Sequence, residues 1–226
     1  PHGGTNMQAL IFDLDGTLID TVYAHVFAWQ RTFAEAGMTI NAWRIHRRIG
    51  MSGGLFTRAI GRELNHRFTP QEVDALQQRH GEIFSQIMPE RQPLPGAVEL
   101  IKFLRLNKIP FGIATSGARP EINASLYALG IEDDTVVIER NNVQRAKPEP
   151  DLFIACQEKL GVQSNNCYVV GDAVWDILAA RRAGMLSIGL LSGGVGEDEL
   201  IRSGAFRTYQ DTAELLRSLD ELGVLP

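Results

Sequence analysis

The chain has 226 residues, of which 44% are hydrophobic and 22% are charged, and its formal net charge at pH 7 is −5. This composition indicates a globular protein with room for one large domain, or for one domain and a small insertion. Because the charge balance is slightly acidic and no long basic tract occurs, we expect no nucleic-acid partner. No apolar run approaches the roughly 18 residues of a membrane span and no signal segment is visible, which predicts a cytoplasmic protein without a membrane partner. The sequence leaves the oligomeric state open.

Short apolar and β-branched runs recur along the chain and predict strands that are buried on both faces. After residues 1–6, which we interpret as an expression remnant, these runs cover residues 8–12, 109–115, 135–139, 167–171 and 186–191. Between them, residues 96–107 and 176–184 have apolar side chains at three- and four-residue spacing, which predicts helices. The alternation predicts an α/β fold with a Rossmann-like parallel sheet, whose functional sites form at the carboxyl ends of the strands.

Residues 21–92 interrupt this alternation. They contain no strand run, only helical patterns such as 21–37 and 69–87, and a Pro-rich connector ends the region. We therefore expect an all-helical subdomain at 21–92, inserted into a core that is made of residues 7–20 and 93–226.

The first predicted strand ends in a pair of aspartates. Asp13 closes the strand, Asp15 lies just beyond it, and Gly16 allows the chain to turn sharply. Asp-Gly is a common turn pair, but a turn needs only one aspartate. Two neighbouring carboxylates repel each other unless a cation or a proton intervenes. The second acid therefore indicates a functional site rather than a plain turn.

Polar residues follow three further predicted strands. These residues are Thr115, Ser116 and Gly117 after the second strand, Lys147 after the third, and Asp172 and Asp176 after the fourth. Taken singly, each has an ordinary interpretation as a helix cap, a solvated cation or an exposed first-turn acid. Lys147 precedes a proline that can begin a helix. Because the carboxyl ends of parallel strands share one edge of the sheet, we expect these side chains to converge.

The chemistry of this group points to phosphoryl transfer. Several oxygen ligands without a His or Cys cluster suit Mg²⁺ and disfavour zinc. A carboxylate can attack phosphorus to form an aspartyl-phosphate, and a second carboxylate can protonate the leaving oxygen and then activate water. Lys147 and the metal would offset the charge on the transferring group. The sequence thus predicts a Mg²⁺-dependent hydrolase of phosphomonoesters.

The segments DLDGTLID, ATSG, AKPEPDLF and GDAVWD resemble, in order and spacing, the four motifs of the haloacid dehalogenase superfamily, in its phosphoglycolate phosphatase and β-phosphoglucomutase-like branch. The resemblance covers nearly the whole chain from Met7. It implies that Asp13 is the nucleophile and a magnesium ligand, and that Asp15 is the general acid and base with its carbonyl on the metal. It further implies that Thr115, with Ser116 and Gly117, and Lys147 bind the phosphoryl group, that Asp172 is a magnesium ligand, and that Asp176 supports the metal or Lys147.

The resemblance also implies that residues 21–92 form a cap that closes over the site, with hinges near 19–21 and 89–95. The expected substrate is a small phosphorylated metabolite, chosen by cap residues. Residues 51–54 form either a cap loop facing the site or a turn between helices. The candidates for substrate contact are His25, Trp29, Arg47, Arg48, Ser52 and His80.

Alternative functions are weighed against specific residues. A non-enzymatic nucleotide- or phosphate-binding module is disfavoured, since no GxGxxG follows the first strand and no GxxxxGK[ST] occurs. The dehalogenase branch normally lacks an acid at the position of Asp15. The phosphonatase branch needs a cap lysine, and residues 21–92 contain none.

A sugar-phosphate mutase resembling β-phosphoglucomutase stays open as an alternative. Mutase relatives typically carry an acid immediately before the aspartate of the fourth motif, where this chain has Gly171. They also carry basic cap residues in the regions of Gly53 and His80. Arg47 or Arg48 could supply the missing charge, so the sequence favours a hydrolase without excluding a mutase.

Overall fold

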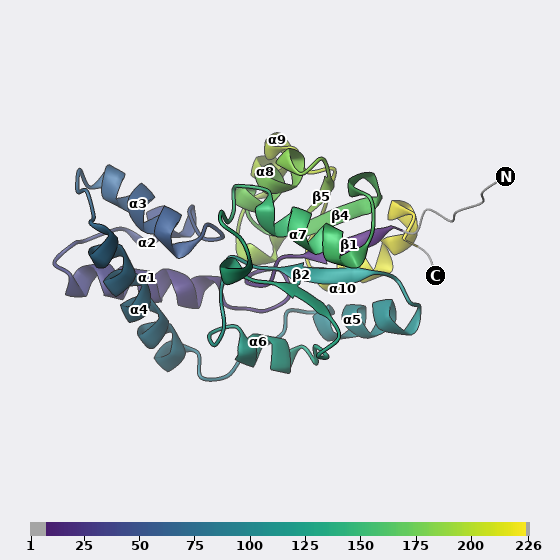
Figure 1. Ribbon diagram of the computed structural model, residues 1–226, viewed down its shortest axis with the longest axis horizontal. Helices are drawn as coiled ribbons and strands as arrows, with labels where there is room; N and C mark the ends of the chain where they lie inside the picture. The colour runs from purple at the N-terminus through teal and green to yellow at the C-terminus, as the bar shows by residue number, and fades with distance from the viewer. Residues whose placement is uncertain (1–7, 225–226) are drawn as a thin grey trace.

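The computed structural model describes residues 8–224, so the interpretation of residues 1–6 as an expression remnant lies outside the described part of the chain. Its centre is a six-stranded parallel sheet in the order β3-β2-β1-β4-β5-β6 (Figure 1). The strands are β1 (Ala9–Phe12), β2 (Phe111–Ala114), β3 (Val136–Ile138), β4 (Cys167–Gly171), β5 (Leu186–Leu190) and β6 (Arg207–Tyr209). The predicted α/β class with a Rossmann-like parallel sheet is confirmed.

Strand β6 is the element that the sequence prediction missed. It is three residues long, and only Tyr209 is buried. Its residues Arg207, Thr208 and Tyr209 form no apolar run, whereas β3, the three-residue strand at the opposite edge, carries the run Val136–Ile138. It pairs with β5 in parallel, with Ile188 opposite Arg207.

The central strands are buried because helices cover both faces of the sheet. Leu10 and Phe12 point into one hydrophobic cluster, whereas Ala9 and Ile11 point into the other, as the two-residue period of a strand requires. The first cluster packs under α5 (Ala97–Leu106), α6 (Asn123–Ala128) and α10 (Thr212–Arg217), and the second under α7 (Asp151–Leu160) and α8 (Val174–Arg182). Helix α9 (Glu197–Ser203) packs beside α8.

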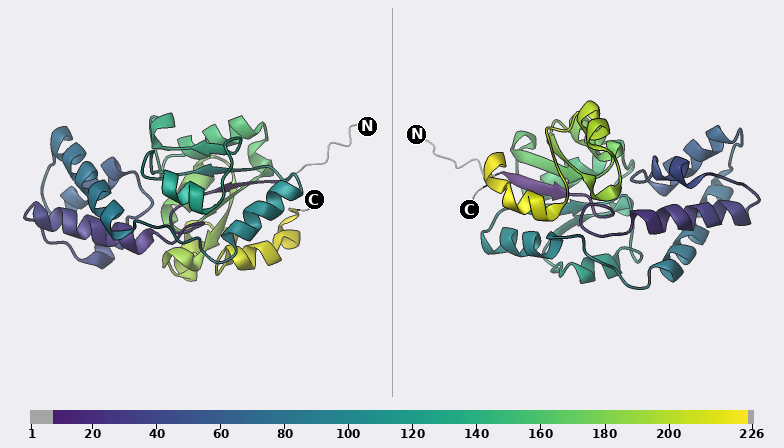
Figure 2. Two further views of the ribbon diagram at one scale, coloured as in Figure 1. Left: turned by 90° about the horizontal axis from the view of Figure 1, so that it is seen from below. Right: turned by 180° about the vertical axis from the view of Figure 1, so that it is seen from behind.

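Four helices form a cap region beyond the carboxyl ends of the strands, at one end of the elongated molecule in all three views (Figures 1 and 2). They are α1 (Val22–Glu35), α2 (Ala42–His46), α3 (Gly53–Glu63) and α4 (Pro70–Ile87). The region has its own hydrophobic cluster, in which Phe33 and Phe56 are buried. Within this region, the most extensive packing is between α1 and α4. A Thr69–Glu72 capping box fixes the start of α4.

Two connectors join this cap region to the sheet, and they lie side by side. The amide of Asp20 donates to the carbonyl of Gln92 at 2.9 Å, and the amide of Leu94 donates to the carbonyl of Leu18 at 2.9 Å. The chain therefore leaves and re-enters the core at one place, below the start of α1. None of the helices within residues 8–224 combines the length and the apolar character needed to cross a membrane.

Candidate active site

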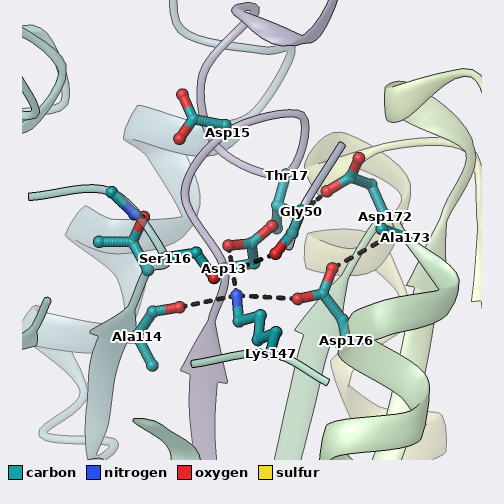
Figure 3. Close-up of polar contacts among 12 residues, drawn as sticks. Asp13, Asp15, Thr17, Gly50, Ala114, Ser116, Lys147, Asp172, Ala173 and Asp176 are labelled. Carbon is teal, nitrogen blue, oxygen red and sulfur yellow. Dashed lines mark hydrogen bonds and ion pairs between the residues drawn. The ribbon is translucent and has the colours of Figure 1, made fainter. Parts of the chain in front are cut away.

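Asp13 and Lys147 form the floor of the site, at the carboxyl end of β1 (Figure 3). The amide of Asp13 donates to the carbonyl of Val170, which fixes the residue between β1 and β4. The Lys147 ammonium is fully buried and donates to Asp13 Oδ1 at 2.6 Å and to the carbonyl of Ala114 at 3.0 Å. A buried ammonium needs such partners, because desolvation alone would neutralise it. Burial lowers the pKa of Lys147, but Asp13 and Asp176 raise it above its ordinary value.

Asp172 and Asp176 complete an acidic cluster at the end of β4. One carboxylate oxygen from each of Asp13, Asp172 and Asp176 lies within 4.8 Å of the others, and all three side chains are buried. Asp176 Oδ1 forms an ion pair with Lys147 Nζ at 2.8 Å, and its Oδ2 accepts the amide of Ala173 at the start of α8. Asp172 Oδ1 accepts the hydroxyl of Thr17 at 3.0 Å. Asp176 therefore braces Lys147 and also remains within reach of a shared cation.

This cluster holds more negative than positive charge, because three carboxylates lie beside one ammonium. Burial raises the pKa of Asp13 to about 7, and the nearby Asp176 carboxylate adds to that rise against the opposing effect of Lys147. Burial also raises the pKa of Asp172 well above its ordinary value, with Asp13 as the next cause. A divalent cation would relieve this repulsion, and carboxylate oxygens suit a hard cation. The residues present thus fit a divalent metal.

Two glycines leave room for the Asp172 side chain. A Cβ added at Gly193 would lie 1.8 Å from Asp172 Oδ2, and one added at Gly16 would lie 2.4 Å from the same oxygen. Gly16 also has φ +81°, a conformation that residues with a Cβ rarely adopt. The Gly193 loop follows β5, and its neighbour Ser192 donates to the carbonyl of Gly16 at 2.7 Å. Glycine backbone from two loops therefore lies close to Oδ2 of Asp172, while the Thr17 hydroxyl donates to its Oδ1.

Asp15 points away from this cluster, toward the cap region (Figure 3). Its Oδ1 accepts the Thr21 hydroxyl and lies 3.2 Å from His25 Nε2. Burial raises the pKa of Asp15, but the charge of His25 and the hydrogen bonds from His25 and Thr21 outweigh it and bring the pKa to about 2. The two aspartates of the first loop therefore have opposite electrostatic surroundings, although only Leu14 separates them in sequence.

A second histidine extends the contact of Asp15 into the cap. His25 Nδ1 lies 3.0 Å from His80 Nε2, and the His80 ring stacks on Trp29 with ring centroids 4.2 Å apart. Burial lowers the pKa of His25, but the Asp15 carboxylate outweighs it and raises that pKa above its ordinary value. For His80, burial and then the charge of His25 lower the pKa well below the ordinary histidine value. With His80 neutral, its Nε2 accepts from Nδ1–H of His25, while Nε2–H of His25 donates to Asp15.

The sequence analysis missed this chain of hydrogen bonds. It placed His25, Trp29 and His80 among candidates for substrate contact, and did not single out Thr21 as a partner of Asp15. The signal available was the four-residue spacing of Thr21 and His25 at the start of a helix, directly after the Asp15 loop. His80 comes from α4, and no pattern in the sequence pairs it with α1.

Thr115, Ser116 and Gly117 follow β2 at the same edge of the sheet. Thr115 is buried, and its hydroxyl accepts the amide of Gly117 at 3.1 Å. Ser116 instead donates its hydroxyl to the carbonyl of Gly50 in the cap, at 3.0 Å. The structure thus brings this loop against both the floor and the cap, and its phosphate-binding role stays a prediction.

The predicted helix start after Lys147 is wrong. Pro148 lies in a turn rather than in the first turn of a helix, and α7 begins at Asp151, directly after Pro150. From this turn, Lys147 reaches Asp13 and the carbonyl of Ala114 at the carboxyl ends of β1 and β2.

A cavity of about 1060 Å³ lies between the floor and the cap region. Asp13, Asp15 and the Thr115 loop line it from the core, and residues 48–56 and parts of α3 and α4 line it from the cap. Residues 51–54 face the cavity, as the first of the two alternatives predicted; they are not a turn between helices, since Ser52 caps α3 and Gly53 and Gly54 belong to its first turn.

The two arginines proposed as alternative anion ligands are already engaged. Arg47 forms an ion pair with Glu199 of the core at 2.9 Å, and its carbonyl accepts the indole N–H of Trp175. Arg48 lines the cavity and pairs with Glu63 of α3. A further bridge joins His46 Nε2 to the carbonyl of Gly193 at 2.7 Å. Arg47 therefore helps to join the cap to the core, and only Arg48 faces the site.

Comparison with known proteins identifies the family. The family described as haloacid dehalogenase-like hydrolase matches residues 7–184. The chain belongs to the haloacid dehalogenase-like hydrolase family. A hydrolase from Pseudomonas syringae has the same fold, with a TM-score of 0.93 and 41% identity, over 96% of this chain and 99% of that one. Within this family the chain is a phosphatase, and its buried acidic cluster is consistent with divalent metal binding.

Curated relatives of the haloacid dehalogenase-like hydrolase family include both phosphatases and a mutase. The fructose-1-phosphate phosphatase of Escherichia coli is 30% identical, over 78% of this chain and 92% of the relative. The phosphoglycolate phosphatase of Rhodospirillum rubrum is 28% identical, over 92% of this chain and 89% of the relative. The β-phosphoglucomutase of Bacillus subtilis is 29% identical, over 93% of this chain and 94% of the relative.

Proposed function

We propose that this protein is a Mg²⁺-dependent phosphomonoester hydrolase that works through an aspartyl-phosphate on Asp13. The observation that carries the proposal is the arrangement of two carboxylates in opposite surroundings beside one cavity. Asp13 lies on the floor against Lys147 and the acidic cluster, whereas Asp15 is held separately by Thr21 and His25. Two-step phosphoryl transfer needs a nucleophile and a separate proton carrier, and this arrangement supplies both.

In the first step, the Asp13 carboxylate attacks phosphorus as the bond between phosphorus and the ester oxygen breaks. Lys147 holds Asp13 in place and offsets charge that builds up on the phosphoryl oxygens. The leaving alkoxide takes its proton from the Asp15–His25 pair. Asp15 has a low pKa and His25 a raised one, so the pair holds one proton across its 3.2 Å contact.

In the second step, water attacks phosphorus, Asp13 leaves as a carboxylate, and inorganic phosphate forms. The Asp15 carboxylate takes the proton from the attacking water: its low pKa keeps it ionised, Thr21 fixes its orientation, and His25, neutral after the first step, lies 3.2 Å away to share the proton. We further propose that the Thr115 hydroxyl and free amides of its loop bind phosphoryl oxygens during both steps.

The donor set supports magnesium as the metal. Asp13 and Asp172 would hold it, with the backbone carbonyl of Asp15 and the Asp176 carboxylate beside them. When bound, the metal neutralises the carboxylates of the floor and the charge of the phosphoryl group. We further propose that residues 21–92 act as a closing cap, with the paired connectors near 19–21 and 89–95 as hinges.

The cap side of the cavity, which is formed by residues 48–56 and parts of α3 and α4 and is called the cap wall below, favours hydrolysis over mutase activity. Gly53 and His80 occupy the regions where basic residues are expected in a mutase, and His80 is buried against Trp29. Arg47, the alternative ligand for a second phosphate, is paired with Glu199 outside the cavity. Of the cavity arginines, Arg48 is paired with Glu63, and Arg58 and Arg62 are exposed on α3, so none is fixed as a ligand for a second phosphate. A bisphosphate intermediate would therefore be held weakly, and water would take the phosphoryl group. The named relatives support a small phosphorylated metabolite as the substrate.

The test is a direct comparison of the two products. The protein is incubated with Mg²⁺ and either p-nitrophenyl phosphate, a panel of sugar and acid phosphomonoesters, or β-glucose 1-phosphate with a trace of glucose 1,6-bisphosphate. We expect inorganic phosphate from several monoesters and little glucose 6-phosphate. Rapid formation of glucose 6-phosphate with little phosphate release would overturn the hydrolase proposal in favour of a mutase.

A further inference from the structure

Glu121 is a carboxylate of the cavity wall that the catalytic steps above do not use. It follows the Thr115 loop of the core and lines the same cavity as Asp15 and His25. Its side chain reaches across to the cap region, because a Cβ added at Gly81 of α4 would lie 3.5 Å from Glu121 Oε2. Glu121 therefore stands where the core and the cap meet, on the side of the cavity that holds the proton carrier.

The cations around Glu121 are committed to other groups. Arg119, two residues earlier, donates to Glu139 through its guanidinium at 3.0 Å and through its amide at 3.1 Å. Arg91 donates to the carbonyl of Met88 and stacks over Phe84, and His25 is bound to Asp15. Among residues 8–224, no side chain forms a hydrogen bond or an ion pair with the Glu121 carboxylate. The Glu121 carboxylate therefore keeps hydrogen-bonding capacity for a molecule in the cavity.

Glu121 interacts electrostatically with the Asp15–His25 pair. Burial raises the pKa of Glu121; His25 and Arg91 lower it, and Asp15 raises it. In return, Glu121 is among the groups that raise the pKa of His25. The ester's alcohol part must lie near Asp15 to receive its proton, so Glu121 faces that part of the substrate and not the phosphoryl group.

We propose that Glu121 is a specificity-determining residue that accepts hydrogen bonds from hydroxyl groups of the substrate's alcohol part and disfavours a carboxylate there. The inference rests on the proposed phosphatase function and names its substrate class: phosphomonoesters of polyhydroxylated alcohols, such as sugar or sugar-alcohol phosphates, rather than phosphorylated carboxylic acids. An unpaired carboxylate gains charge-assisted hydrogen bonds from hydroxyls, but it repels a second carboxylate in a low-dielectric cavity.

The arginines of α3 act on a different part of the substrate. Arg58 and Arg62 line the same cavity but are exposed to solvent on the cap. Exposed cations at a cavity wall attract any dianionic phosphate ester from a distance, without selecting its alcohol. Glu121 is more deeply placed and interacts electrostatically with the catalytic pair, so it dominates the choice of leaving group.

The experiment uses a matched pair of substrates, glycerol 3-phosphate and 3-phosphoglycerate, which differ mainly in a hydroxymethyl group against a carboxylate. p-Nitrophenyl phosphate, which offers neither group, reports the phosphatase reaction by itself. For the unaltered protein, we expect kcat/KM to favour glycerol 3-phosphate by about tenfold or more. In Glu121→Gln, which keeps the shape and removes the charge, this preference should shrink to about a factor of three or less, with most of the change in KM.

Two further variants make the result decisive. Glu121→Lys should reverse the preference toward 3-phosphoglycerate, whereas Asp74→Asn, which removes another acid of the same cavity wall, should leave it unchanged. Turnover of p-nitrophenyl phosphate should stay within about twofold in Asp74→Asn; for the Glu121 variants the readout is the ratio of the two kcat/KM values, because any effect of Glu121 on the Asp15–His25 pair is common to both esters and cancels in the ratio. If the unaltered protein prefers 3-phosphoglycerate, or if Glu121→Gln and Asp74→Asn shift the preference equally, the inference is wrong. Absence of p-nitrophenyl phosphate hydrolysis would instead contradict the phosphatase function.

Discussion

The floor and the cap wall of the cavity are built in opposite ways. On the floor, Asp13, Lys147 and Asp176 are almost fully buried, and each is fixed by at least one charged partner. On the cap wall, Arg58 and Asp74 are exposed, and neither has an ion-pair partner among residues 8–224. Groups on the floor can therefore hold only one arrangement, whereas groups on the wall are free to adapt to a ligand.

This difference separates chemistry from selection. Buried charges that are fully paired are rigid, and rigid groups are what a reaction with fixed geometry needs. Exposed side chains can change by substitution with little effect on stability. The Asp15–His25–His80 chain is the exception, because it runs from the core loop into the cap and connects the two regions.

The largest expected effect comes from removing the nucleophile on the floor. Asp13→Asn keeps the shape of the side chain but loses its nucleophilic oxygen, so turnover of p-nitrophenyl phosphate should fall by about four orders of magnitude or more. Thermal unfolding followed by circular dichroism should show that the fold persists. Asp20→Asn is the matched control, since Asp20 is exposed at the end of the same loop and should retain full activity. A folded Asp13→Asn protein with near-normal activity would refute the assignment.

Removal of the metal should also stop the reaction at the floor while leaving the cap wall unaffected. Excess chelator is expected to abolish turnover, and added Mg²⁺ to restore it, whereas Ca²⁺ should restore little because its larger coordination shell would misplace Asp13. Titration calorimetry on Asp172→Asn should show Mg²⁺ affinity reduced by about tenfold or more. Full activity in excess chelator would argue against a metal-dependent mechanism.

Asp15→Asn should have a smaller effect that depends on the substrate. Loss of proton transfer should lower kcat by a factor of about 100 to 10,000 for alkyl phosphates. The loss should be much smaller for p-nitrophenyl phosphate, because p-nitrophenolate leaves without a proton. Equal losses with both kinds of ester would mean that Asp15 acts in some way other than as an acid.

The smallest effect concerns the stability of the metal-free protein. Asp13, with its pKa raised to about 7, and Asp172 bind protons more tightly in the folded than in the unfolded chain. Stability gained from this binding is lost as the pH rises, and the raised pKa of His25 acts in the same sense. The buried His80 acts oppositely, but only below the ordinary histidine pKa of 6.5.

The melting temperature of the metal-free protein should therefore fall by a few degrees between pH 6.5 and 8, at about 2–4 °C per kcal/mol. Saturating Mg²⁺ should remove most of this decline, because the metal replaces the protons. The slope should be shallower in Asp172→Asn. A melting temperature that rises over this interval would show that the carboxylates of the floor are already neutralised by other means.

The sequence predicted the floor well because strand ends are strong signals. Asp13, Thr115, Lys147 and Asp172 each follow an apolar run, and parallel strands bring such positions to one edge. Strand β6 was missed because it reads Arg-Thr-Tyr, with no apolar run, whereas the other edge strand, β3, reads Val-Val-Ile and was predicted. The start of α7 was misplaced because two prolines precede it and either could begin a helix.

The cap wall was less predictable for a physical reason. The pairing of His25 with His80 and the approach of Glu121 to Gly81 depend on how α4 packs against α1 and the core, which no local pattern encodes. Periodicity shows which face of a helix is apolar, but it does not show which polar side chains meet across two elements.

The glycines around Asp172 have a consequence for how the protein tolerates change. Gly16 and Gly193 carry no reactive group, yet any larger residue would occupy the space of the Asp172 carboxylate. A library of random variants selected for activity would therefore be as depleted at these two positions as at the aspartate itself. A grafted cap taken from a relative would need a compatible loop after β5, because the carbonyl of Gly193 also accepts the hydrogen bond from His46. To transfer the specificity of a relative, the cap and this loop would therefore have to be exchanged together.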